Sequence, residues 1–543
     1  MFKDIAKQIS SRPQRYIESN TVPFLIGIFG FLYTMPLKVL NPLFTKWLLH
    51  DDSAQHYLGW VFFKNSSWHF PFGANPNFGN SSSSTIVYSD SFPLLAIVLK
   101  FLLGAIHTNF QFFGIAVLFC FIFQAIISYR IFQFFALPKY LVVIGTVFLT
   151  ITPSMLFRLR DHTSLSAQFL ILIAIYLYLL SPQKFSATKW NFLLVFTLGI
   201  HFYIFAMILP FYVASFFARG AEPLKSKILF FSRNSLYSLV FCLISGFLYG
   251  YKFGSAAESG FGYFKANLLT LINSEGFASN IFNFRQGSGE YEGYGFLGLG
   301  LLGILVFTLS SQVARNYLAR LEARYSHLKF IIFFTYLFAL TPNLGIGKYQ
   351  IKLFEKIPLD GIFGILRSSG RLIWVTVYLV SIFALVGLNK VFIKHKRQKL
   401  IIVLVATSLL CLQVIDGYAS LNSNKERIIG SAIDQPDDLK VLSNLATGKK
   451  AINVYPVGDT SEWIDIATVA AKFNITLGSV YLARTNKKEQ FLANIKFIQD
   501  VKANKLSKNE IWLIDTSMGS NKLVNDYLDS HEYVVWRHFK ILV

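Results

Sequence analysis

Long apolar runs, separated by short polar segments, constrain this chain more than any other feature of its sequence. They fall near residues 22–40, 110–135, 140–157, 165–181, 229–250, 294–311, 328–342, 372–393 and 399–417. A helix that crosses a bilayer core needs roughly 20 apolar residues, and these runs approach that length. Charged residues make up 15% of the 543 residues, against about 25% in soluble domains. The sequence therefore predicts a polytopic α-helical membrane protein.

Two further apolar stretches have to be assigned before the spans can be counted. Residues 92–106 are short for a span and contain Lys100, so we expect an amphipathic helix on the outer surface of the membrane. Residues 190–218 are long for one helix and short for two. Reading them as a two-helix hairpin puts the later Lys and Arg clusters into cytoplasmic loops. The positive-inside rule then gives about 11 spans, a cytoplasmic N-terminus and an extracytoplasmic C-terminus.

The net charge of +22 fits this arrangement. Lys and Arg in cytoplasmic loops face anionic lipid headgroups, so the excess does not indicate nucleic-acid binding. A basic segment precedes the first apolar run, with Lys3, Lys7, Arg12 and Arg15. We expect that run to be a retained signal anchor in the cytoplasmic (inner) membrane of a bacterium.

The chain changes character near residue 418. Strand patterns at 449–457, 475–483, 509–516 and 532–543 alternate with helical patterns at 461–473, 487–504 and 521–530. This predicts a transmembrane domain over 1–417 and a small extracytoplasmic (periplasmic) α/β domain over 418–543. No Gly-rich phosphate loop follows a strand there, so nucleotide binding is not supported. The domain could bind an acceptor, close over a cavity or contact a partner.

Polar residues gather in segments that this topology places on the outer side. These are a first loop over 41–91, later loops near 251–293 and 343–371, and a short segment around Arg158. The candidate catalytic residues are Asp52 and Asp51. The candidate substrate-binding residues are Gln55, His56, His69, Asp90, Arg158, Arg160, Asp161, His162, Glu290, Glu292, Arg367 and Arg371. Carboxylates, imidazoles and guanidinium groups on one face predict a catalytic cavity at the bilayer surface.

Glycosyl transfer from a lipid-phosphate donor suits these residue types. A carboxylate at the membrane rim can take the proton of an acceptor hydroxyl, and arginines can hold the leaving phosphate by charge-assisted bonds. Simpler roles compete with these. Asp51 and Asp52 could begin a helix with an acidic first turn, Asp161 could cap the next helix, and arginines at helix ends often reach lipid headgroups.

Several segments resemble an uncharacterised bacterial multi-pass family. They are "HDDSAQHYLGWVFFKNSSWHFPFGANP", "YSDSFPLLAIVLK", "GEYEGYGFLGLG" and "LRSSGRLIW". That family resembles a branch of the GT-C glycosyltransferases, which are integral membrane enzymes using polyprenyl-phosphate or dolichyl-phosphate sugars. The resemblance implies that an Asp at the head of the first outer loop is the catalytic base, and Asp52 fits that pattern better than Asp51. The adjacent pair departs from the spaced acidic pair of metal-using members, so a requirement for Mg²⁺ or Mn²⁺ stays open.

The sequence thus predicts transfer of a sugar from a polyprenyl-phosphate donor to an extracytoplasmic glycan or glycolipid, such as lipopolysaccharide. Two alternatives remain. A lipid-linked oligosaccharide flippase would need ionisable residues within the spans, which these runs largely lack. A glycan polymerase or ligase would use the same outer arginines but transfer a preassembled oligosaccharide.

Overall fold

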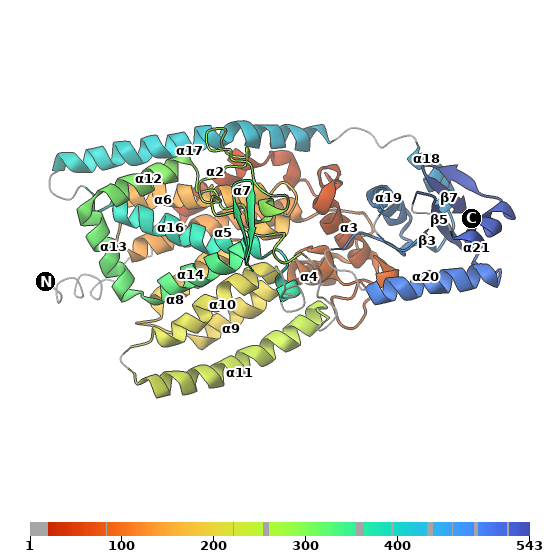
Figure 1. The fold of residues 1–543 in the computed structure, drawn as a ribbon, viewed down its shortest axis with the longest axis horizontal. Coiled ribbons are helices and arrows are strands. Elements are labelled where there is room, and N and C mark those ends of the chain that lie inside the picture. The colour runs from red at the N-terminus through yellow and green to blue at the C-terminus, as the bar shows by residue number, and fades with distance from the viewer. Residues whose placement is uncertain are drawn as a thin grey trace.

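The computed structural model describes residues 20–82, 84–220, 222–252, 260–353, 363–391, 396–431, 438–458, 460–482, 487–517 and 521–543. The basic N-terminal segment expected before the first apolar run lies outside these residues. Figure 1 shows an elongated molecule with a helical bundle at one end and a smaller α/β domain at the other. Long helices α17 and α11 run along opposite sides of the bundle.

The bundle is built from helices of very different lengths. They are α2 (Thr21–Thr34), α3 (Asp51–Asn65), α4 (Pro93–Leu103), α5 (Phe113–Phe134), α6 (Lys139–Thr150), α7 (Pro153–Arg158), α8 (Phe169–Leu180), α9 (Ala187–Leu198), α10 (Phe202–Phe217), α11 (Leu224–Tyr249), α12 (Leu299–Ser310), α13 (Gln312–Arg324), α14 (His327–Leu340), α16 (Ile373–Leu388) and α17 (Lys396–Gly430). Short 3-10 turns, η1 to η8, connect several of them, and strands β1 (Asn343–Ile346) and β2 (Tyr349–Lys352) form an antiparallel hairpin.

The prediction of about 11 spans is wrong. Within the described residues, six helices are long and apolar enough to cross a bilayer, or seven if α12 and α13, bent by 95° at Ser311, count as one span. The sequence count took every apolar run as a complete helix. Pro36 follows the end of α2 after one residue, and Pro342 follows the end of α14 in the same way. Proline removes a helix hydrogen bond, so both helices stop at 14 residues.

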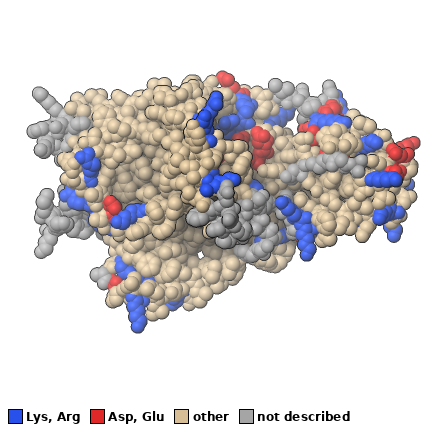
Figure 2. Space-filling model, in the orientation of Figure 1, with Lys and Arg blue, Asp and Glu red and all other residues tan. Residues whose placement is uncertain are grey.

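Two of the six candidate spans carry most of the exposed apolar surface that favours a membrane environment. The apolar window of α11 is only 6% buried inside the protein, and that of α17 only 17%, whereas the span Ser369–Leu388 is 89% buried. Apolar helices exposed over such a length need a nonpolar solvent. Figure 2 shows a broad band with few charges over the bundle. Lys and Arg appear at the end of the bundle that lies away from the C-terminal domain. These exposed apolar helices are compatible with association of the protein with a membrane.

The two ambiguous stretches fold as short helices. Residues 190–218 contain α9 and α10, separated by a break at Gly199–His201, which confirms the hairpin but yields helices of only 12 and 16 residues. Residues 92–106 contain α4, 11 residues long. Lys100 turns inward and donates to Ser66 Oγ at 3.1 Å. Phe101 and Leu102 are 78% and 65% exposed, so α4 presents an apolar outer face, as expected for an interfacial helix.

The C-terminal domain is a mixed five-stranded sheet with helices. Its strands are β3 (Ala451–Tyr455), β4 (Thr476–Leu477), β5 (Glu510–Asp515), β6 (Val534–Trp536) and β7 (Phe539–Leu542). Its helices are α18 (Leu439–Ala446), α19 (Trp463–Phe473), α20 (Lys487–Lys502) and α21 (Lys522–Asp529). The order is β4-β3-β5-β7-β6, with β3 parallel to β4 and β5 and with β7 antiparallel to β5 and β6. The predicted α/β alternation is confirmed, and the last predicted strand divides into the β6–β7 hairpin.

The first outer loop joins the two parts of the molecule. Leu477 of β4 accepts a backbone bond from Gly79 at 3.0 Å and donates one to Asn77 at 2.9 Å. The loop therefore extends the β4 edge of the C-terminal sheet and pairs the outward backbone groups of Leu477. On the other side of the molecule, α17 continues past residue 418 to Gly430. The boundary expected at 418 falls inside this helix.

We predict that Gly73→Ala destabilises the protein because the first outer loop passes close to the end of α11. A Cβ at Gly73 would lie 1.7 Å from the backbone oxygen of Tyr249, whereas one at Gly220 would meet nothing within 4 Å. Overpacking of this kind costs about 1–3 kcal/mol. Thermal unfolding in detergent should show a lower midpoint for Gly73→Ala and no change for the control Gly220→Ala. Equal midpoints would contradict this packing.

Candidate functional site

Asp52 and His162 form the centre of the candidate site. Asp52 lies in the first turn of α3, after the N-cap residue His50, and His162 follows the end of α7. The two side chains meet, with His162 Nε2 3.0 Å from Asp52 Oδ2. Ser53 Oγ donates to the backbone oxygen of Asp161 at 3.2 Å, which fixes the two segments together. The sequence placed both residues among the candidates, and the structure joins them as a pair.

The environment of Asp52 keeps its carboxylate ionised. Burial alone would raise its pKa, but the hydrogen bond and positive charge that His162 can offer, with a smaller contribution from His56, outweigh burial and lower the pKa. Its side chain is still 29% exposed, whereas that of Asp51 is 77% exposed. Asp52 is therefore a charged proton acceptor that a solute can reach, and Asp51 is a surface residue of the same helix turn.

Glu292 binds two arginines that come from distant parts of the chain. Arg371 of η8 (Ser369–Leu372) donates to both carboxylate oxygens, at 2.7 and 2.9 Å. Arg158 at the end of α7 lies 3.0 Å from one of the same oxygens and donates to the backbone oxygen of Glu292 at 2.7 Å. All three side chains are buried. Glu292 lies in η6 (Glu290–Gly293), so this cluster ties three segments together below Asp52 and His162.

This ion cluster changes the role expected of its arginines. Burial would raise the pKa of Glu292, but Arg158 and Arg371 outweigh it and lower the pKa well below its usual range. The carboxylate is therefore ionised and bonds both arginines, which leaves the cluster with one positive charge in excess. A buried cluster of this kind orders the site and is not a ready phosphate receptor. Arg158 and Arg371 contribute to the site by holding the segments around it in place.

Two buried histidines lie near the ion cluster. His56 contacts Thr163 Oγ1 through Nδ1 at 3.3 Å, and its ring centre lies 5.9 Å from that of His162. Burial and the neighbouring His162 lower the pKa of His56 to about 3, so its imidazole is neutral. His201 accepts from the backbone N–H of Tyr203 at Nδ1, at 3.1 Å. A neutral His201 therefore carries its proton on Nε2, which lies 3.7 Å from Asp90 Oδ1.

A second polar cluster lies at the outer rim of the site. His50 Nδ1 is 3.5 Å from Asp51 and 3.6 Å from Asp161. Arg427, near the end of α17, places Nη1 within 2.7 and 2.9 Å of the two ring nitrogens of His50. Its Nη2 donates to the backbone oxygen of Arg160 at 3.1 Å. Arg160 itself has an exposed side chain. This cluster borders Asp52 through the neighbouring residues Asp51 and Asp161.

The rim cluster offers ligand types for a divalent cation but does not fit one well. One ligand atom each of His50, Asp51 and Asp161 lie within 4.8 Å of one another, and carboxylate oxygens suit Mg²⁺ or Mn²⁺. The guanidinium of Arg427 already contacts both nitrogens of His50. A cation bound there would meet a positive charge at close range. The space beside His50 is therefore better suited to the guanidinium of Arg427 than to a metal ion.

The other predicted residues lie in different settings. Gln55 is buried and donates to the backbone oxygens of Tyr88 and Tyr481. It therefore connects α3 to the C-terminal domain. Glu290 accepts from Asn267 at 2.7 Å and from Gln350 at 2.9 Å and supports the β1–β2 hairpin. The remaining two lie at the periphery: His69 is exposed, 3.0 Å from Ser67 Oγ, and half-buried Arg367 contacts the ring of Phe264.

Three residues of the site were not predicted from the sequence. They are His50, His201 and Arg427. The sequence contained a sign of the position of His201, because a Gly-Ile-His break inside a long apolar run often marks the turn of a hairpin. It contained no such sign for Arg427. The stretch around Arg427 was assigned to the C-terminal domain, whereas the structure places it on the last turn of a candidate span.

Family models match most of the chain. One described as a domain of unknown function, DUF6311, matches residues 24–418. Another, described as the DUF6311 C-terminal domain, matches residues 441–533. No curated protein matches the sequence.

We predict that Glu292→Gln destabilises the protein strongly, because it leaves Arg158 and Arg371 buried without a counter-charge. Breaking a buried pair in this way costs about 3–5 kcal/mol. The control is Glu222→Gln, which removes an exposed partner of Arg219 and should cost at most about 1 kcal/mol. Thermal unfolding of both variants in detergent tests this. Similar midpoints for the two variants would show that the cluster is not structural.

Proposed function

The chain belongs to the DUF6311 family, and we propose that it is a membrane glycosyltransferase that moves a sugar from a polyprenyl-phosphate donor to an extracytoplasmic glycan or glycolipid. One observation supports this most: a partly exposed carboxylate of lowered pKa, Asp52, lies beside His162 and next to a polar rim that includes Arg427, in a protein with helices apolar enough to cross a bilayer. A donor tethered to the membrane would present its anomeric carbon at this level.

In the proposed reaction, Asp52 takes the proton of an acceptor hydroxyl. The hydroxyl oxygen then attacks the anomeric carbon of the sugar, and the bond between that carbon and the phosphate oxygen breaks. The electron pair leaves with the lipid phosphate. His162, which donates to Asp52 at 3.0 Å, keeps the carboxylate oriented and charged, so it is a positioning residue. Proton transfer of this kind contributes roughly 10²- to 10⁴-fold to a rate.

The buried residues support this chemistry indirectly. Glu292, Arg158 and Arg371 connect the segments that carry Asp52 and His162 to η6 and η8. His56 and His201 add neutral imidazoles with buried nitrogen atoms, Nε2 in each, that lack a hydrogen-bond partner among the described residues. Such atoms suit the hydroxyl groups of a sugar. We place the site on the periplasmic side of a bacterial inner membrane, with the C-terminal domain on the same side.

We predict that Asp52→Asn abolishes the glycan modification while membrane insertion stays normal. A deletion strain should lack a monosaccharide mass in its surface glycans or glycolipids, and the wild-type gene should restore it. Asn keeps the shape of the side chain but cannot accept the proton, so the mass should not return. Asp529→Asn, an exposed substitution in the C-terminal domain, should restore it fully. A full return of the mass with Asp52→Asn would remove the proposed base.

The pH dependence of transfer provides a second prediction. A base acts when ionised, so activity falls as the pH drops through its pKa. His162 lowers the pKa of Asp52, which should extend activity of the wild type to acidic pH. In the His162→Leu variant the burial of Asp52 is no longer offset by His162, so the pKa of Asp52 rises. The acidic limb of the pH profile of kcat/KM should therefore move to higher pH. The donor sugar identified from the missing mass allows this assay, and an unmoved limb would show that Asp52 is not the titrating base.

A further inference from the structure

Arg427 occupies an unusual position for an arginine on a lipid-exposed helix. It lies three residues before Gly430, the last residue of α17, in a polar last part of a helix whose apolar window is little buried. The outer end of such a helix is where a phosphate tethered to a lipid chain would lie. Arginine side chains at helix ends usually reach toward headgroups. This one turns instead toward His50 and Arg160, beside the candidate site.

None of the direct contacts of Arg427 that the structure describes is with a carboxylate. Nη1 contacts the ring nitrogens of His50, and Nη2 donates to the backbone oxygen of Arg160 and to Asn424 Oδ1 at 2.9 Å. Asp51 and Asp161 lie beside His50, 3.5 and 3.6 Å from its Nδ1. The guanidinium is therefore held in place without a direct bond to a carboxylate, unlike Arg158 and Arg371, which share Glu292.

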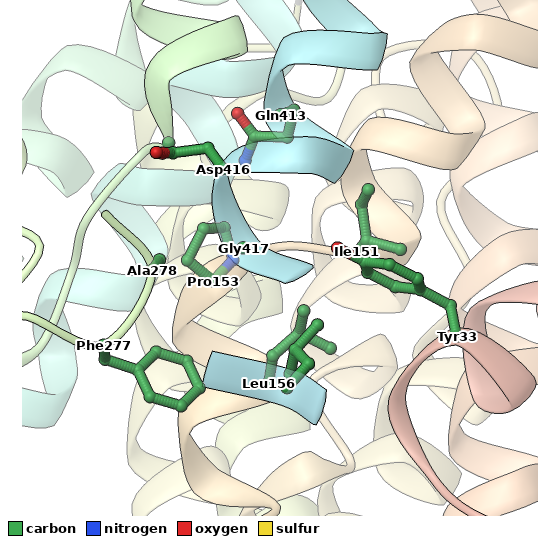
Figure 3. A pocket seen from close by; sticks show the side chains of 11 residues that line it. Tyr33, Ile151, Pro153, Leu156, Phe277, Ala278, Gln413, Asp416 and Gly417 are labelled. Carbon is green, nitrogen blue, oxygen red and sulfur yellow. The ribbon is translucent and has the colours of Figure 1, made fainter. Parts of the chain in front are cut away.

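A mainly apolar pocket lies beside α17, on the membrane-span side of Arg427 along the helix. Figure 3 shows Tyr33 of α2, Leu156 of α7 and Phe277, in the loop after α11, converging on α17. Leu421 of α17 also lines it, about 9 Å along the helix from Arg427 at 1.5 Å per residue. Gln413 and Asp416 are polar members of its lining, and in Figure 3 the Asp416 side chain points away from Tyr33 and Leu156. An exposed cation further along the same helix than an apolar recess matches a lipid phosphate, with the charged group at Arg427 and the first carbons toward the recess.

We propose that Arg427 is the built-in cation of this site, standing where a divalent metal ion would bind and holding the phosphate of the polyprenyl donor. This inference rests on the proposed function, since it assigns the donor phosphate to a place in the same site. The cluster of His50, Asp51 and Asp161 would otherwise supply metal ligands. With the guanidinium against both nitrogens of His50, the protein needs no divalent cation for donor binding. The exposed guanidinium of Arg160 adds a second positive charge beside it.

The first experiment measures metal binding without any transfer assay. Mn²⁺ titration followed by electron paramagnetic resonance should show no tight site in the wild-type protein. Arg427→Ala should gain Mn²⁺ affinity by at least about 10-fold, because one positive charge is removed from contact with the ligands. Arg427→Gln replaces it if the Ala variant does not fold. The control is Lys425→Ala, which removes a cation from the same helix where it donates to Leu32 O, and it should behave as the wild type.

The second experiment measures phosphate binding with a sugar-free probe. Polyprenyl monophosphate in nanodiscs should bind the wild type and Lys425→Ala equally, and Arg427→Ala roughly 10- to 100-fold more weakly, the loss expected for charge-assisted hydrogen bonds. A zwitterionic phospholipid competitor should not displace it. Tight Mn²⁺ binding by the wild type, or unchanged probe binding by Arg427→Ala, would overturn the inference.

The two proposals can fail separately. If Asp52→Asn retains glycan modification while both Arg427 results hold, the transferase proposal fails and the lipid-phosphate site stands. If Asp52 is essential but removal of divalent cations by EDTA abolishes transfer and Mn²⁺ restores it, the inference about Arg427 fails and the transferase proposal stands.

Discussion

The bonds between Glu292 and two arginines are the interaction on which the rest of the site depends. They connect α7, η6 and η8, with 134 residues between the bonded residues of α7 and η6 and 79 between those of η6 and η8. Each arginine would be costly to bury alone, and the shared carboxylate bonds both, although one positive charge stays in excess. Because His162 follows Arg158 by four residues, the same bonds fix the segment that orients Asp52. The catalytic geometry is therefore set by charges that need not contact substrate.

The electrostatic layout divides the site into two zones. In the inner zone, Glu292 bonds both Arg158 and Arg371, and the histidines His56 and His201 are buried. At the rim, the contacts described for Arg427 and Arg160 include no close pair with a carboxylate, although Asp51 and Asp161 lie near His50. In a substrate with an uncharged sugar and a charged phosphate, the sugar would match the inner zone and the phosphate would match the rim. For this reason the proposed phosphate ligands are exposed arginines and not the buried ones, which looked like the best candidates in the sequence.

The sequence predicted the parts of this protein that depend on local pattern. The α/β alternation over 449–543, the hairpin at 190–218, the short helix in 92–106 and the gathering of Asp52, His162, Glu292 and Arg371 all follow from periodicity or from loop placement. The span count failed because apolar content continues past Pro36 and Pro342, where helices must stop. The pairing of Arg158 with Glu292, and the reach of Arg427 to His50, depend on tertiary contacts that no spacing in one sequence reveals.

The C-terminal domain is part of this site's construction and not an appended module. Its edge strand β4 pairs with residues 77–81 of the first outer loop, and Gln55 of α3 donates to the backbone oxygen of Tyr481. Gln55 lies three residues after Asp52 on the same helix. An unpaired loop of this length would lose conformational entropy when it folds over the bundle, and pairing with a preformed sheet edge offsets that loss. The domain therefore contributes to the position of Asp52 through the loop and helix to which it is bonded, whether or not it also contacts an acceptor.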